Sequence, residues 1–291
     1  MTAFPETPRE LLIAGHVNVD RFLTVRAFPP PDRTVPVLAT EDRLGGPAAN
    51  LALVASRYGV RTGIVARIGE GFPEGFIESL TRAQVDLRGL AQMPNRSTPT
   101  CTIVVDRRGQ QRTLIDQGPM ASDEGALPPS SVFRQYSWLH VTTGPPGFHL
   151  RLVRRARELG LRVAADPAQE IHYRWDARRF RSLLADSEIL FGNRSEIARA
   201  ARLAGVRSLS RLTERIPLVV RTEGANGVTA FAGGSSVHVR ALRPSRVRTF
   251  VGAGDAFRGG FYSGWFAGLP LKSCLTAGIR AASRWVARPG E

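Results

Sequence analysis

A carboxylate that follows a run of very small residues is the feature of this chain best suited to chemistry. Asp255 closes the sequence G-A-G-D, at the start of a helical pattern. Gly252, Ala253 and Gly254 carry almost no side chain, so their backbone amides can approach an anion at the positive end of that helix. Asp255 could then accept the proton of a hydroxyl group that attacks this anion, as phosphoryl transfer requires. By itself, the pattern is equally that of a Gly-rich turn capped by Asp.

Four further elements accompany G-A-G-D along the chain. Residues 15–20 read G-H-V-N-V-D, residues 45–50 read G-G-P-A-A-N, residues 193–196 read N-R-S-E and residues 222–227 read T-E-G-A-N-G. In this order the five elements resemble the PfkB (ribokinase-like) family of carbohydrate and nucleoside kinases over nearly the whole chain. The resemblance implies ATP-dependent transfer of the γ-phosphoryl group to a primary hydroxyl of a sugar or of a nucleoside's ribose. It also implies that Asp255 is the catalytic base.

The resemblance implies that the first two of these four elements build the acceptor pocket. Asp20 would follow the first strand, where ligands of open α/β sheets bind, and could accept two neighbouring sugar hydroxyls. Asn18, Gly45 and Gly46 are assigned to the same pocket. Asn50 joins them because its amide both donates and accepts hydrogen bonds. Taken singly, these residues are also ordinary turn, strand-end or helix-start residues.

The class of acceptor stays open in the sequence. Asp166 and Gln169 belong to a D-P-A-Q stretch that is similar to the stretch in microbial adenosine and other nucleoside kinases, and we assign both to the substrate. The G-G-P-A-A-N element, in contrast, is typical of fructokinase-like members. A nucleoside and a free sugar are therefore both candidate substrates.

The other two elements are assigned by resemblance to the phosphoryl donor. Asn193 and Glu196 would organise the triphosphate and its Mg²⁺, mostly through water, and Thr222, Gly224 and Gly227 would surround the nucleotide. Asn193 as a helix N-cap with Glu196 at the third helical position is an equally sound interpretation, and both can hold at once.

The chain departs from the family pattern just before the anion site. The family's D-T-x-G-A-G-D element begins with an Asp that commonly helps to hold a monovalent cation, whereas Thr249 stands here. Binding of that cation is therefore in doubt. Arg258, one helical turn after Asp255, could reach a phosphate, but we expect it on a solvated helix face.

Apolar runs alternate with helical patterns, which predicts an α/β fold with a mainly parallel, doubly wound sheet in a three-layer α/β/α sandwich, ribokinase-like by resemblance. The expected strands span residues 11–14, 63–66, 138–142, 162–165, 188–191 and 218–221, and the expected helices span 47–58, 72–83, 149–159, 176–184, 195–203 and 255–267.

Two inserted segments, about 16–44 and 97–117, interrupt this alternation with strands and turns, including a hairpin of residues 100–105 and 110–115. The resemblance implies that they form a small β lid over the site. The prediction is thus a single PfkB-type kinase domain over residues 1–291. Exposed strand edges in the lid further predict a homodimer through the lid.

The composition excludes several other classes of protein. The net charge is +15 and all but one of the 40 basic residues are arginine, but the arginines are spread along the chain, so dedicated nucleic-acid binding is not expected. No apolar run reaches membrane-spanning length and the N-terminus is polar, so we expect a cytoplasmic protein. Cys101 and Cys274 predict neither a disulfide nor a zinc site, and the five histidines are expected to be structural or superficial. A noncatalytic regulatory protein that binds a sugar or nucleoside is the alternative to a kinase.

Overall fold

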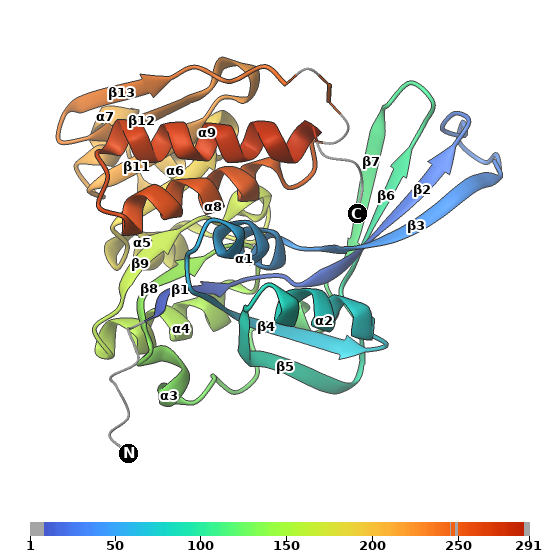
Figure 1. Ribbon diagram of the computed structural model, residues 1–291, viewed down its shortest axis with the longest axis horizontal. Coiled ribbons are helices and arrows are strands. Elements are labelled where there is room, and N and C mark those ends of the chain that lie inside the picture. Colours follow the sequence, from blue (N-terminus) through green and yellow to red (C-terminus); the bar gives the residue numbers. More distant parts are fainter. Residues whose placement is uncertain (1–8, 245, 248–249, 288–291) are drawn as a thin grey trace.

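A nine-stranded sheet runs through the centre of the protein (Figure 1). The computed structural model describes residues 9–244, 246–247 and 250–287. The strand order is β13-β12-β11-β10-β9-β8-β1-β4-β5, and all neighbouring pairs are parallel except β11–β12 and β12–β13. These strands are β1 (Arg9–Ala14), β4 (Thr62–Glu70), β5 (Asp86–Ser97), β8 (Tyr136–Val141), β9 (Arg162–Ala165), β10 (Ile189–Asn193), β11 (Leu218–Thr222), β12 (Val228–Ala232) and β13 (Ser235–Val239).

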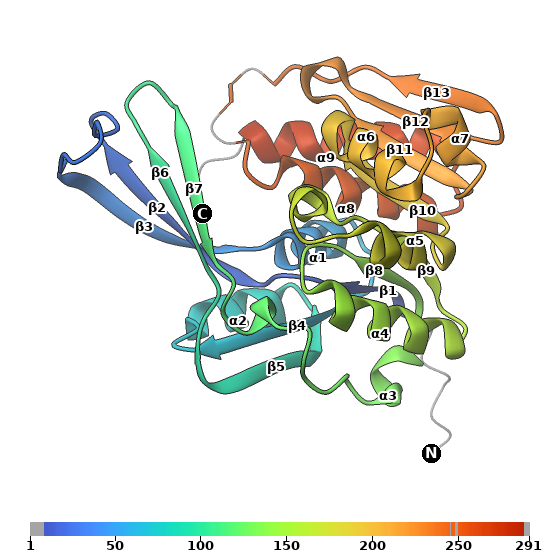
Figure 2. The same cartoon turned by 180° about the vertical axis from the view of Figure 1, so that it is seen from behind.

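Helices cover both faces of this sheet and give three layers (Figures 1 and 2). One face packs against α1 (Pro47–Arg57), α2 (Glu74–Arg82), α8 (Ala253–Phe266) and α9 (Leu271–Ala287). The other face packs against α3 (Ser130–Phe133), α4 (Pro146–Glu158), α5 (Ala177–Ala185), α6 (Arg194–Ala204) and α7 (Leu209–Thr213). Successive residues of β1 point to opposite layers: Leu11 and Ile13 join the first core, and Leu12 and Ala14 join the second. Such two-sided burial explains why the parallel strands are continuous apolar runs.

A separate four-stranded sheet projects from this body (Figure 1). Its order is β3-β2-β6-β7, and the pairs are antiparallel except for β2–β6, which is parallel. The strands are β2 (Asn18–Val25), β3 (Val37–Gly45), β6 (Thr100–Val105) and β7 (Gln111–Asp116). We call this sheet the lid. Asp20 pairs with Cys101 and Cys101 pairs with Ile115, so these three side chains stand on the same face of the lid.

The predicted fold class is confirmed, and each of the six predicted strands and six predicted helices overlaps an observed element. The chain also forms β5, β12, β13 and α9, which the sequence analysis did not predict. Three short 3₁₀ helices complete the chain: η1 (Gly118–Ala121), η2 (Ala168–His172) and η3 (Gly224–Asn226). Among the described residues, no helix is both long enough and apolar enough to span a membrane.

Candidate active site

A cavity of about 280 Å³ lies where the lid meets the carboxyl ends of β1, β8 and β9. This is the edge of a parallel sheet where α/β proteins bind ligands. Seven of the residues that the sequence assigned to catalysis or substrate line the cavity: Asn18, Asp20, Gly46, Asn50, Gln169, Gly252 and Asp255. The others that line it are His16, Pro47, Cys101, Ile103, Thr113, Ile115, Thr143, Glu170 and Val251.

The first turn of α8 forms one end of this cavity. Gly252 is the N-cap of α8 and has φ 76° and ψ 0°, a left-handed conformation that glycine adopts without strain. A Cβ at this position would lie 2.8 Å from the indole of Trp285. Asp255 follows in the first turn, where Asn50 Nδ2 donates to its Oδ2 over 3.1 Å. Helix geometry leaves the amides of a first turn without intrahelical acceptors, although Ala253 N here donates to Phe250 O (3.2 Å).

Asp20 lies at the start of the lid, close to the body. Asn18 and Asp20 point to the same side of β2, and Asn18 Nδ2 donates to Asp20 Oδ1 over 2.7 Å. Gly45 pairs with Asn18 at the end of β3. Gly46 then turns the chain into α1 with φ 93°, and a Cβ there would overlap the carbonyl oxygen of His16. This tight turn brings Asn50, on the first turns of α1, to Asp255.

Burial raises the pKa of two of the carboxyls that line the cavity, Asp255 and Asp20. It raises the pKa of Asp255 to about 7, although the guanidinium of Arg258 and the amide of Asn50 act in the opposite direction. It also raises the pKa of Asp20 to about 6, opposed by the hydrogen bond from Asn18 and the charge of Arg43. A carboxyl with a pKa near 7 is suited to act as a general base at neutral pH.

Asp166, which the sequence assigned to the substrate, pairs with an arginine behind the cavity lining. It follows β9, is buried and does not line the cavity, whereas Gln169 does. Arg258 Nη2 donates to Asp166 Oδ1 over 2.8 Å, and Arg258 Nε contacts Oδ2. Arg258 is itself buried, so our expectation of a solvated helix face was wrong. The carboxylate of Asp166 thus binds an arginine of the protein, and its contact with substrate stays a prediction.

Polar side chains that the sequence analysis missed line the side of the cavity that the body of the protein forms, opposite the lid. His16 follows β1, and its Nδ1 lies 3.0 Å from the hydroxyl of Thr143, which follows β8. Glu170, on η2, accepts a hydrogen bond from Gln117 Nε2 (3.0 Å) and another from Gly144 N (2.5 Å). His16, expected to be structural or superficial, is thus a cavity residue. In the sequence, the position of His16 just after a buried strand could have indicated that it lies at the site.

The donor-side residues gather at the ends of β10 and β11. Asn193 and Glu196 form a capping box: Asn193 Oδ1 accepts from Glu196 N (3.0 Å), and Glu196 Oε2 accepts from Asn193 N (2.7 Å). Asn193 pairs with Thr222 across β10–β11, and Gly224 begins η3, which Gly227 follows. The N-cap interpretation is confirmed. Contact of any of these five residues with a nucleotide or Mg²⁺ stays a prediction.

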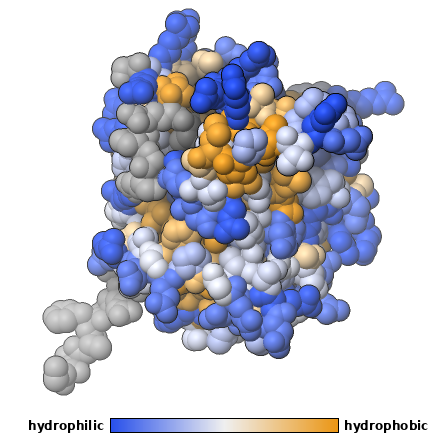
Figure 3. Space-filling view, turned by 90° about the vertical axis from the view of Figure 1, so that its right-hand side faces the viewer, coloured by the Kyte–Doolittle hydropathy of each residue, from blue (hydrophilic) through white to orange (hydrophobic). Residues whose placement is uncertain are grey.

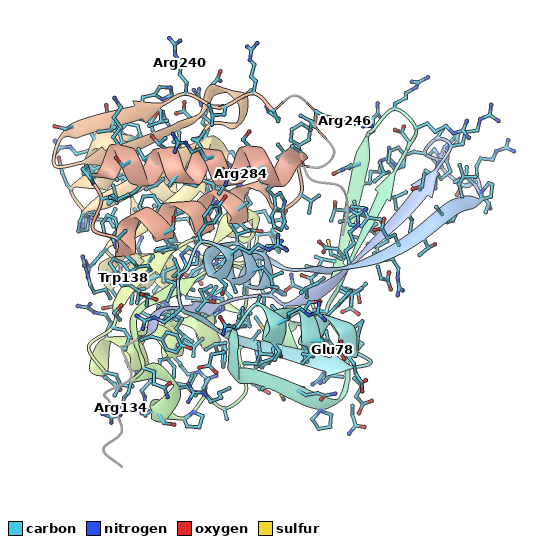
Figure 4. The ribbon with its side chains drawn as sticks, in the orientation of Figure 1. Glu78, Arg134, Trp138, Arg240, Arg246 and Arg284 are labelled. Carbon is cyan, nitrogen blue, oxygen red and sulfur yellow. The ribbon has the colours of Figure 1, made fainter. Side chains whose placement is uncertain are left out.

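Arginines occur in distant parts of the molecule, on its surface and in its interior. Arg134 and Arg240 lie at opposite ends of the molecule, and Arg284 lies on α9 between them (Figure 4). Many of the described arginines are paired with carboxylates, for example Arg21 with Asp42. Cys101 and Cys274 are free thiols, as expected.

Comparisons with known proteins agree with this geometry. Residues 8–291 match the pfkB family of carbohydrate kinases. The chain is 31% identical to a nucleoside kinase of Methanothermobacter thermautotrophicus over 91% of this chain and 85% of that protein. It is 26% identical to a cytidine kinase of Thermococcus kodakarensis over 97% and 98% of the two chains. The crystal structure of the nucleoside kinase of Methanocaldococcus jannaschii superposes with a TM-score of 0.87, at 24% identity, over 97% and 93% of the chains.

Fold, site and relatives together define a kinase that acts on a small molecule. The chain belongs to the pfkB family of carbohydrate kinases, and its fold is the three-layer ribokinase-like fold. The alternative of a noncatalytic regulatory protein is therefore set aside.

Proposed function

We propose that this kinase transfers the γ-phosphoryl group of ATP to the primary hydroxyl of a nucleoside's ribose. The carrying observation is the position of two carboxyls, the half-buried Asp255 and the buried Asp20, on one cavity at the amino end of α8. Asp20, with Asn18, would bind vicinal ribose hydroxyls. The primary hydroxyl would then lie at Asp255, which would take its proton while the amides around Gly254 bind the transferring phosphoryl group.

The lining of the cavity favours a nucleoside over a free sugar. A volume of about 280 Å³ is close to the lower limit of roughly 300 Å³ for sites that hold drug-sized ligands. Ile103 and Ile115 offer apolar surface from the lid, and Thr143, Gln169 and Glu170 offer polar atoms from the body. A nucleobase has both an apolar face and a polar edge, so it matches these apolar and polar side chains. Relatives that are nucleoside and cytidine kinases support the same choice.

The donor would lie beyond the first turn of α8, over Thr222, Gly224 and Gly227. Glu196 is buried, which raises the pKa of its carboxyl, and Asn193 N occupies only its Oε2. Among the residues that the structure describes, no group of three His, Cys, Asp or Glu side chains could hold a metal ion. Two side chains, Asn193 and Glu196, suit an ion that keeps much of its water. Mg²⁺ would therefore be held mainly by the phosphates of ATP and by water, with Glu196 and Asn193 contacting that water.

A coupled ADP-release assay across nucleosides, ribose, fructose and ketodeoxygluconate tests the choice of acceptor. We expect the best nucleoside to exceed every free sugar in kcat/KM by about tenfold or more. A free sugar would leave the apolar surface of Ile103 and Ile115 exposed to water, and burying apolar surface of one or two methylene groups contributes about 1–2 kcal/mol. A free sugar that matched the best nucleoside would contradict the proposal for a nucleoside and leave the kinase assignment in place.

We further propose that activity depends little on a monovalent cation. Thr249 has a neutral hydroxyl where the resembled family has a carboxylate, and it lies outside the described residues. Replacing K⁺ by a bulky organic cation at fixed ionic strength should change the rate less than about threefold, or less than about 0.7 kcal/mol in the barrier. Strong, saturable activation by K⁺ over Na⁺ would contradict this expectation.

We also propose a homodimer through the lid. Val37 and Leu38 on β3 and Leu114 on β7 are 48%, 50% and 63% exposed, and β3 and β7 are the two edge strands of the lid. Figure 3 shows apolar side chains gathered on the side of the molecule that carries the lid. Exposed apolar surface next to open strand edges favours an interface between copies. Sedimentation at micromolar concentration tests this, and a monomer would contradict it.

A further inference from the structure

A buried arginine lies directly behind the proposed catalytic base. Arg258 is on α8, one turn after Asp255, and only 5% of it is exposed. Its Nη1 passes so close to the first turn of α8 that a Cβ at Gly254 would lie 2.8 Å from it. The other guanidinium nitrogens, Nη2 and Nε, engage both oxygens of Asp166. The guanidinium therefore joins the start of α8 to the end of β9.

Two further side chains complete this network. His140 Nε2, on β8, lies 3.4 Å from Asp166 Oδ2, and His140 Nδ1 lies 2.8 Å from the hydroxyl of Tyr262. Burial lowers the pKa of His140, so its ring is neutral. Because the carboxylate of Asp166 can only accept, we place the ring proton on Nε2 and let Tyr262 donate to Nδ1. Tyr262 is one turn after Arg258, so the network begins and ends on α8.

We infer that Arg258, held by Asp166, is a positioning residue for phosphoryl transfer that favours the ionised form of Asp255 and fixes the first turn of α8. The inference rests on the proposed role of Asp255 as the base. Neither Arg258 nor Asp166 lines the cavity, so neither is assigned a contact with substrate.

The charges around Asp255 show why a cation is needed there. Asp20 from the lid and Asp166 from the end of β9 both act to raise the pKa of Asp255, in addition to burial. Arg258 and the amide of Asn50, from α1, act to lower it. Glu196 from α6 acts on Arg258, while α9 contributes the indole of Trp285, which donates to Val251 O. Arg258 is thus the cation that opposes a group of carboxylates.

This arrangement gives the two partners opposite effects on Asp255. Removing the charge in Arg258→Gln should raise the pKa of Asp255, whereas removing the charge in Asp166→Asn should lower it. The acid limb of the pH profile of kcat/KM, set by the free enzyme, should therefore move to higher pH in Arg258→Gln and to lower pH in Asp166→Asn. We expect a displacement of about one pH unit in the first variant, which corresponds to about a fivefold loss at pH 7. A purely structural role would lower activity in both variants without separating their acid limbs.

Removing one partner of a buried ion pair can unfold a protein, so a double variant is included. Arg258→Met with Asp166→Leu replaces the pair by apolar side chains, a change that folded proteins often tolerate. Arg258 has the larger effect of the two on Asp255, so the acid limb of the double variant should also move to higher pH. Arg67→Gln is the matched control, because Arg67 is equally buried but donates to the carbonyl of Ser122. Its acid limb should stay at the wild-type position.

Titration of the Asp255 carboxyl carbon by ¹³C NMR gives the same pKa without turnover. Opposite shifts in the two single variants, and an upward shift in the double variant, are the expected result. Equal shifts, or none in the double variant, would overturn the inference. If Asp255→Asn instead kept full activity, the base assignment would fail, while the NMR titration would still report whether Arg258 controls the charge of Asp255.

Discussion

Replacement of Asp255 by Asn should lower kcat by roughly a hundredfold or more and leave nucleotide affinity unchanged. The Asn side chain keeps the shape and can still accept the hydrogen bond from Asn50 Nδ2, but it has no basic oxygen for the proton of the acceptor. Steady-state kinetics at saturating substrates and calorimetric titration with a nonhydrolysable nucleotide measure the two quantities. Turnover at the wild-type rate would show that Asp255 is not the base.

The same variant should be more stable than the wild type at alkaline pH, which separates lost chemistry from lost folding. Burial raises the pKa of Asp255 from 3.8 to about 7, so the folded state binds this proton more tightly than the unfolded state. The carboxyl therefore costs stability increasingly as pH rises from about 4 to 7, and the cost is constant above that. Its upper limit is about 4 kcal/mol at 1.36 kcal/mol for each pKa unit. The difference in Tm between Asp255→Asn and wild type should grow over the same range.

Replacement of Asp20 by Ala should act on the acceptor and spare the donor. It removes charged hydrogen bonds in a desolvated cavity, each worth about 1.5–3 kcal/mol, so KM for the acceptor should rise by about tenfold to a hundredfold. KM for ATP should stay within about twofold, because Asp20 lies at the lid end of the cavity. Initial rates with each substrate varied in turn give both constants.

Asp42→Ala is the matched control for Asp20→Ala. Asp42 is also a lid carboxylate, on β3, but it is exposed and pairs with Arg21 on the outer surface. A surface ion pair of this kind contributes little, so neither KM should change. If Asp20→Ala instead raised KM for ATP and left that for the acceptor unchanged, Asp20 would belong to the donor site.

The layers of the fold were predictable because the parallel strands are buried on both faces. Their apolar runs, such as residues 11–14, stand out from the amphipathic helices between them. β5 and β13 were missed because β5 has few buried residues and β13 has none, as expected at the two edges of the sheet. The antiparallel β12–β13 hairpin did carry a signal, the Gly233-Gly234 turn.

The site was predictable only where a short motif fixes the local geometry. The G-A-G-D element identified the start of α8, and the G-G-P-A-A-N element identified the turn that brings Asn50 to Asp255. The pair of Asp166 and Arg258 joins residues 92 positions apart, and no local pattern reports such a contact. His16 and Glu170 became neighbours of the site only through the strand order β9-β8-β1.

The central claim is transfer of a phosphoryl group to the primary hydroxyl of a nucleoside. ³¹P NMR of the wild-type protein with ATP, Mg²⁺ and the best nucleoside of the acceptor screen tests it most directly. We predict a nucleoside 5′-phosphate that accumulates in step with ADP in the wild type and is reduced about a hundredfold or more in Asp255→Asn. Release of inorganic phosphate with an unmodified nucleoside, or a phosphate ester at a ring hydroxyl, would contradict the account.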